Sequence, residues 1–206
     1  MIDFVLHFDR HLLEFVRDYG SWVYAILFTI VFAETGFVVT PFLPGDSLLF
    51  ATGALCATGS LSAPAMFALL VFAAFAGNVV NFAVGRFVGP RVFTGSGSRL
   101  LNRQYLDRAH AFVEQYGGKA VILGRFVPIV RTFVPFVAGA AQMTSAAFVL
   151  NNLVGATAWV GLCLGAGFVF GNVPIVKNNF SLVTIGIVVV SILPMVYELM
   201  ANRRRH

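Results

Sequence analysis

Two carboxylates and two guanidiniums lie in apolar stretches of the chain that are broken by prolines. Glu34 and Asp46 belong to the first stretch, and Arg125 and Arg131 belong to the second. A charge at bilayer depth costs roughly 2.5 to 3.5 kcal/mol on insertion scales, so such a residue indicates a substrate or ion pathway. Paired planar guanidiniums match a phosphate better than a metal or a neutral solute. We therefore expect these four residues to form the functional site, with the arginines binding phosphate.

The same four charges allow other interpretations. Each arginine could pair with Glu34 or Asp46 only to hold the protein together, because buried ion pairs are common in membrane interiors. Asp46 could act as a plain cap for the helix that follows it. Two arginines and two acids would also suit a transporter that couples a small organic anion to protons or sodium.

Prolines explain how side chains distant in the sequence can meet. Pro41, Pro44 and Gly45 lie between the acids, where a continuous helix is not expected because proline removes a backbone donor. Pro128 lies between the arginines, whose six-residue spacing would otherwise place them on separate helix faces. Pro135 fits the start of the next half-helix. We predict two re-entrant hairpins, since irregular backbone at membrane depth must be buried in protein or line a wet cavity.

Composition places these elements in a membrane. Of the 206 residues, 58% are hydrophobic and 11% are charged, and the mean hydropathy is +0.84. Runs of at least about 18 apolar residues mark membrane helices, and we predict spans at 63–84, 145–170 and 181–200. The expected fold class is an all-α polytopic membrane protein, with transmembrane helices, two opposed re-entrant hairpins and an N-terminal amphipathic helix.

The remaining segments set the expected topology. Residues 1–20 place apolar side chains at helical spacing, which predicts an amphipathic helix in the membrane interface or on the cytoplasmic face of the protein. Residues 21–200 form one membrane-embedded domain, with a polar segment at about 86–119. Positive charge puts this segment and the tail 201–206 in the cytoplasm, so nucleic-acid binding is not expected. Whether residues 21–40 cross the membrane or form a hairpin arm stays open.

Groups that enzymes use are missing from the charged stretches. The four histidines lie in polar or interfacial segments: His7, His11, His110 and His206. The chain has no nucleophile elbow, no zinc-binding histidine pair and no phosphate-binding P-loop. Cys56 and Cys163 lack CxxC spacing and are expected to pack in the interior. We therefore expect neither enzyme activity nor a metal or other cofactor.

These motifs resemble those of the DedA family, whose shared region is also called the SNARE-associated or VTT domain. The resemblance runs from about Glu34 to Gly171 and is most specific in RFVPIVRTFVPFVAGAAQM at 125–143. The other matching motifs are E-x-G at 34–36, PGD at 44–46, GNVVNFAVGRFVG at 77–89 and F-x-x-x-N-x-x-G-A-x-x-W at 148–159. The family often has Asp and Tyr where this chain has Asn78 and Phe82.

The resemblance implies a membrane-embedded lipid transporter with two opposed hairpins. Bacterial members are associated with returning undecaprenyl phosphate across the cytoplasmic membrane, others move phospholipids, and eukaryotic relatives behave as scramblases. By motif match, the essential acids of the family fall on Glu34 and Asp46, and its essential arginines fall on Arg125 and Arg131.

We therefore expect an inner-membrane flippase whose arginines bind the lipid phosphate and whose acids bind protons or another coupling ion. A proton- or ion-coupled transporter of a small organic anion is the alternative. The small-xxx-small spacing of Gly161 and Gly165 either seats neighbouring helices or marks a homodimer face.

Overall fold

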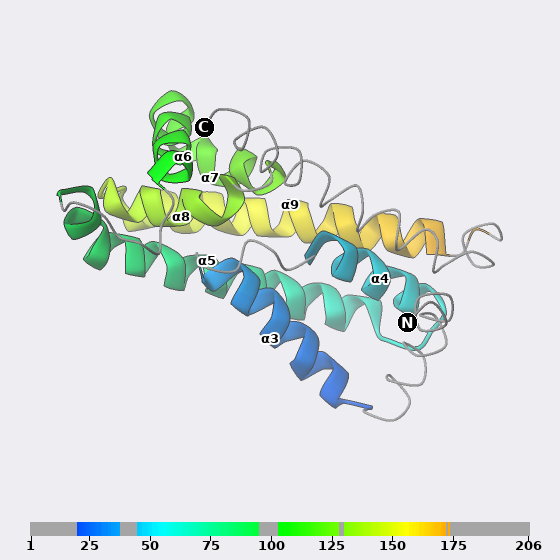
Figure 1. Cartoon of the computed structure of the whole chain (residues 1–206). Coiled ribbons are helices and arrows are strands. Elements are labelled where there is room, and N and C mark those ends of the chain that lie inside the picture. The colour runs from blue at the N-terminus through cyan, green and yellow to red at the C-terminus, as the bar shows by residue number, and fades with distance from the viewer. Residues whose placement is uncertain (1–19, 38–44, 95–102, 128–129, 172, 174–206) are drawn as a thin grey trace, which may run out of the picture. The chain divides into compact units, whose positions relative to one another are not determined.

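The computed structural model describes residues 20–37, 45–94, 103–127, 130–171 and 173, and these residues are almost entirely helical, without β-strands (Figure 1). The elements are α3 (Trp22–Gly36), α4 (Gly45–Ala57), α5 (Ala63–Thr94), α6 (Arg103–Tyr116), η1 (Gly117–Lys119), α7 (Ala120–Leu123), η2 (Gly124–Phe126), α8 (Val130–Ala140) and α9 (Ser145–Gly171). The prediction of an all-α fold is confirmed for these residues. The predicted amphipathic helix and the predicted span 181–200 lie outside them.

Two of these helices are long and apolar enough to cross a membrane. The segment Ala63–Val88 of α5 has a mean hydropathy of 2.1, and Ser145–Gly171 has a mean hydropathy of 1.9. At 1.5 Å per residue, the 26 residues of the shorter segment span roughly 39 Å, which exceeds a hydrocarbon core of about 30 Å. Many large apolar side chains on both helices are exposed, among them Phe72, Phe87, Leu150 and Leu162. Such a surface suits contact with lipid.

The first span continues further than the sequence predicts. The apolar run was expected to end near Gly85, whereas α5 continues to Thr94 and so includes the start of the predicted polar segment. Charged residues do not interrupt helical hydrogen bonding, and Gly95, which directly follows the helix, is a residue type favoured at helix ends.

The described residues form two compact units. The first contains residues 20–28, 45–70, 160–171 and 173, and the second contains residues 29–37, 71–94, 103–127 and 130–159. In the first unit, α4 packs closely on the C-terminal part of α9 because both helices have glycine at the contact. A Cβ atom on Gly53 would overlap the carbonyl of Leu164, and one on Gly167 would overlap the carbonyl of Phe50.

The second unit has its own apolar core, to which α5, α6, α7, α8 and α9 contribute. Phe82 of α5 stacks on Phe148 of α9, with ring centroids 4.1 Å apart, and Phe136 and Val137 of α8 are fully enclosed beside them. A Cβ atom on Gly139 would overlap the carbonyl of Phe82, so glycine is needed where α8 crosses α5. This core positions the short irregular segment between α7 and α8.

That irregular segment confirms a helix break between the two arginines. The turn η2 ends at Phe126, Val127 is extended with φ −105° and ψ 110°, and α8 begins at Val130. A residue before proline avoids helical angles, so the conformation of Val127 follows from Pro128, which lies outside the described residues. Whether this element is re-entrant stays a prediction.

Pro135 does not start a half-helix, and that prediction is wrong. The helix α8 already begins at Val130, directly after the break, and continues through Pro135 to Ala140. The proline therefore removes only one backbone hydrogen bond within α8, the bond to the carbonyl of Arg131.

For the first predicted hairpin, the structure describes only the helices on either side of the break. The helix α3 ends at Gly36, and α4 begins at Gly45 with Asp46 in its first turn, as expected for a helix that restarts after the proline pair. Pro41 and Pro44 lie outside the described residues.

Candidate functional site

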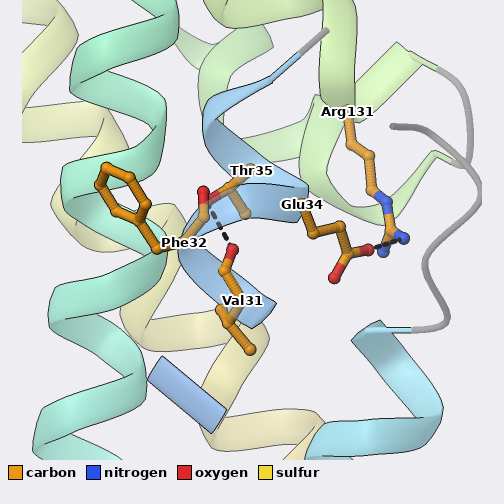
Figure 2. A network of polar contacts seen from close by, with 5 residues as sticks. All are labelled: Val31, Phe32, Glu34, Thr35 and Arg131. Carbon is orange, nitrogen blue, oxygen red and sulfur yellow. Dashed lines mark hydrogen bonds and ion pairs between the residues drawn. The ribbon is translucent and has the colours of Figure 1, made fainter. Parts of the chain in front are cut away.

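An ion pair joins one predicted acid to one predicted arginine. Glu34 lies near the C-terminal end of α3, Arg131 lies in the first turn of α8, and Figure 2 shows the two side chains pointing at each other. Arg131 Nη2 donates a hydrogen bond to Glu34 Oε1 at 2.5 Å. The Glu34 side chain is 2% exposed and the Arg131 side chain is 18% exposed. The pair is thus shielded from solvent on the acidic side and partly open on the basic side.

A small cavity lies beside this ion pair. Its volume is about 20 Å³, and it is lined by Glu34, Thr35, Asn78, Arg125, Arg131, Thr132 and Trp159. That volume has room for about one water molecule. The structure therefore brings three of the four predicted charges to one small cavity.

Arg125 is the most unusual group at this cavity. It is only 5% exposed, yet within the described ranges its hydrogen bonds go only to neutral oxygens. Its Nη2 donates to Asn152 Oδ1 at 2.7 Å and to the Ala74 carbonyl at 3.1 Å. Its Nε has no hydrogen-bond acceptor among the residues that the structure describes. A buried charge is normally neutralised by a partner of opposite sign, so an anion bound beside Arg125 would be energetically favourable.

Trp159 of α9 brings the two arginines to one aromatic ring. The Cζ atom of Arg125 lies 5.9 Å from the ring centroid, and that of Arg131 lies 5.7 Å from it. Both distances are within the range of cation–π attraction. Trp159 is only 4% exposed, so this attraction acts where water does not screen it. The arginines, which lie on either side of the helix break, thus converge on one ring that also lines the cavity.

A buried amide network supports Arg125. Asn152 Oδ1 accepts from Arg125 and from Asn78 Nδ2 at 3.0 Å, while Asn152 Nδ2 donates to the Phe75 carbonyl at 3.0 Å. Asn152 is fully buried, and Asn78 is 3% exposed. The sequence analysis did not single out Asn152. A detectable signal existed, because this amide lies within an apolar span seven residues before Trp159, on the same helix face.

A second amide holds the two helix ends that carry the ion pair. Asn81 Nδ2 donates to the carbonyl of Thr35 at 3.3 Å and to the carbonyl of Thr132 at 2.9 Å. Thr35 adjoins Glu34, and Thr132 adjoins Arg131. The Thr35 hydroxyl turns back to the Val31 carbonyl at 2.8 Å, as Figure 2 shows, and the Thr35 carbonyl accepts from Asn81 of α5. Asn81 thereby fixes the backbone on both sides of the ion pair.

Asp46 belongs to the first compact unit, and the residues that line the cavity belong to the second. It lies in the first turn of α4, where a carboxylate is favourable for the helix dipole, and its approach to Glu34 stays a prediction. Within the described ranges, no three His, Cys, Asp or Glu side chains cluster as a metal site would require.

Fold and site together define a helical membrane protein with one buried arginine, one partly buried arginine and an acidic partner at a helix break. The VTT domain matches residues 43–169. Protein DedA of Escherichia coli K12 is 52% identical over 206 residues, covering 99% of this chain and 94% of that protein. The chain belongs to the DedA family of VTT-domain membrane proteins.

More distant relatives are also membrane proteins by name. An uncharacterized membrane protein of Mycobacterium tuberculosis H37Rv is 40% identical over 178 residues, covering 85% of this chain and 78% of that protein. Inner membrane protein YqjA of Escherichia coli K12 is 35% identical over 153 residues, covering 74% and 70%. No solved structure matches this chain.

Proposed function

We propose that this protein moves a phosphate-bearing lipid, undecaprenyl phosphate or a phospholipid, between the leaflets of a bacterial inner membrane. It acts as a transporter and not as an enzyme, with protons or another ion as the coupling species. The proposal rests mainly on Arg125. This cation is buried, and among the described residues it donates hydrogen bonds only to neutral oxygens. The name of its relative YqjA, an inner membrane protein, supports the location.

The chemistry of Arg125 favours an oxyanion as the cargo. An ion removed from water costs several kcal/mol unless an opposite charge and hydrogen bonds replace the lost hydration. A phosphate supplies both, because its oxygens can accept from several N–H groups of one or two guanidiniums. The Nε of Arg125, which has no acceptor among the described residues, and the nearby guanidinium of Arg131 offer donors for such oxygens.

Glu34 supplies the exchange step in this mechanism. Its carboxylate occupies Arg131 beside the cavity that both arginines line, and a phosphate bound to the same guanidinium would lie next to a like charge. The lipid phosphate therefore replaces the carboxylate on Arg131 instead of adding to it. A proton bound by Glu34 removes the charge that competes for Arg131, which couples proton binding to lipid binding. Asp46 is the second proposed proton-binding acid.

Transport by the reconstituted protein tests this function. Liposomes that contain the purified protein and a fluorescent phosphatidate are expected to move this lipid between leaflets faster than protein-free liposomes. Arg125→Ala and Arg131→Ala should abolish the acceleration. Arg86→Ala is the matched control, because Arg86 donates to Ser145 Oγ at 2.9 Å and does not line the cavity.

Two outcomes would overturn the proposal. Wild-type rates from both Arg125→Ala and Arg131→Ala would remove the phosphate-binding role of the arginines. Uptake of a soluble organic anion into the liposome lumen, dependent on Arg125 and without lipid movement, would establish the small-anion transporter in its place.

A further inference from the structure

Three residues on one face of α9 surround the Arg125 side chain. Asn152, Gly155 and Trp159 are spaced at i, i+3 and i+7, which places them in line along a helix. Each contacts Arg125 in a different way, and together we call them the α9 seat. Trp159 also lies 5.7 Å from the Cζ atom of Arg131, whose guanidinium donates to Glu34.

Asn152 fixes the charged end of Arg125. Its Oδ1 accepts from Arg125 Nη2 at 2.7 Å, and its Nδ2 donates to the Phe75 carbonyl at 3.0 Å. Because the Phe75 carbonyl only accepts, the amide must direct its nitrogen there and its oxygen to the arginine. Asn78 donates to the same oxygen at 3.0 Å, which further fixes this orientation.

Gly155 leaves room for the stem of Arg125. A Cβ atom at this position would lie 3.1 Å from Arg125 Cδ, 3.3 Å from its Nε and 3.2 Å from the Ile122 backbone. These distances are shorter than ordinary van der Waals contacts, so any side chain at 155 would press on the arginine from the side where its Nε lies.

The seat is neutral, and this is its main chemical property. It supplies a hydrogen-bond acceptor and an aromatic face, both of which orient a guanidinium without cancelling its charge. Arg131, in contrast, is held by the carboxylate of Glu34. The two arginines therefore differ in how a phosphate can reach them, since only one of them must first exchange an acidic partner.

We propose that the α9 seat makes Arg125 a fixed, charge-uncompensated anchor for the lipid phosphate, while Arg131 is the arginine that exchanges Glu34 for it. Asn152 and Gly155 are then positioning residues. The inference rests on the proposed function and adds a division of labour between the arginines.

A substitution that adds a negative charge to the α9 seat distinguishes an anchoring role of Arg125 from a purely structural one. Asn152→Asp keeps the acceptor for Arg125 but neutralises the cation, whereas Asn152→Ala removes the acceptor and leaves the charge; both variants lose the donor to the Phe75 carbonyl. A purely structural seat predicts that Asp is tolerated better than Ala, because it still holds Arg125. An anchor predicts the reverse order for phosphate binding.

Isothermal titration calorimetry with dioctanoyl phosphatidate and the full chain in detergent micelles measures this order. We expect Asn152→Asp to bind at least about tenfold more weakly than the wild type and more weakly than Asn152→Ala. Asn151→Asp is the matched control, since it adds the same charge one residue away, where Asn151 bonds the Ala147 carbonyl of its own helix. That variant should keep wild-type affinity.

A second pair of variants protects the test against misfolding. Gly155→Ala should weaken binding several-fold, whereas Gly165→Ala, at a position with no atom within 4 Å of an added Cβ, should not. Equal affinity of the wild type, Asn152→Asp and Gly155→Ala would overturn the anchor while leaving the proposed function intact. A wild-type protein that does not bind phosphatidate would overturn the proposed function and, with it, the anchor.

Discussion

Replacement of Glu34 by glutamine should tighten the binding of a phosphate lipid and slow its transport. In the wild-type protein the carboxylate occupies Arg131 through a charge-assisted hydrogen bond. Such bonds contribute roughly 1.5 to 3 kcal/mol, and each 1.4 kcal/mol corresponds to a tenfold change in affinity. Removal of the competing charge should therefore raise affinity about 10- to 100-fold. Transport should fall, because no carboxylate remains to displace the phosphate and release it.

The pH dependence of lipid affinity tests the same competition independently. In the wild type, a fall in pH protonates Glu34, weakens its hold on Arg131 and should tighten lipid binding. In Glu34→Gln the affinity should be high and should not change with pH through this group. Dioctanoyl phosphatidylglycerol is the suitable probe, because its phosphodiester, unlike a phosphate monoester, has no ionisation near about pH 6.

Calorimetric titration of the full chain in micelles at several pH values measures both effects. Glu114→Gln is the matched control, since its side chain is 71% exposed and lies 3.6 Å from His110, outside the cavity. This control should behave like the wild type. If Glu34→Gln binds no more tightly than the wild type and keeps the same pH dependence, the competition between carboxylate and phosphate is refuted.

Three further variants test separate parts of the site and its support. Trp159→Leu, which removes the ring that both arginines contact, should reduce lipid transport more than Trp159→Phe does, as measured in the same liposomes. Asn81→Ala removes the two hydrogen bonds that this amide donates to the Thr35 and Thr132 carbonyls, so the free energy of unfolding in detergent should fall by about 1 to 3 kcal/mol; an unchanged thermal midpoint would contradict this. Gly139→Ala should lower the thermal midpoint clearly, because the new Cβ overlaps the Phe82 carbonyl, whereas Gly165→Ala should not lower it.

The charged residues of the site could be predicted from the sequence because a charge in an apolar membrane segment has a high free-energy cost. An arginine or glutamate in an apolar membrane segment is energetically unfavourable, so its presence indicates a function. A proline nearby indicates where the helix stops. This reasoning found Glu34, Arg125 and Arg131, which line one cavity. It left open which acid pairs with which arginine, because pairing depends on how α3 and α8 are aligned against each other.

The neutral groups of the site were missed for the opposite reason. Asn81 and Asn152 carry no charge and cost less in an apolar segment than an arginine or a glutamate, so their residue type is a weaker signal. Their importance follows from contacts to carbonyls on other helices, which only the fold reveals. Pro135 was misinterpreted because a single proline near a helix start is compatible with either a boundary or an interior position, and packing of α8 decides between them.

The central claim is that Arg125 and Arg131 hold a lipid through its phosphate. Native mass spectrometry of the purified protein, released gently from its detergent, tests this claim most directly by identifying the lipids that stay bound. We expect a prenyl phosphate or an anionic phospholipid on the wild-type protein and its loss from Arg125→Ala and Arg131→Ala, with Arg86→Ala unaffected. The same phosphate lipid bound equally to all four proteins would contradict it.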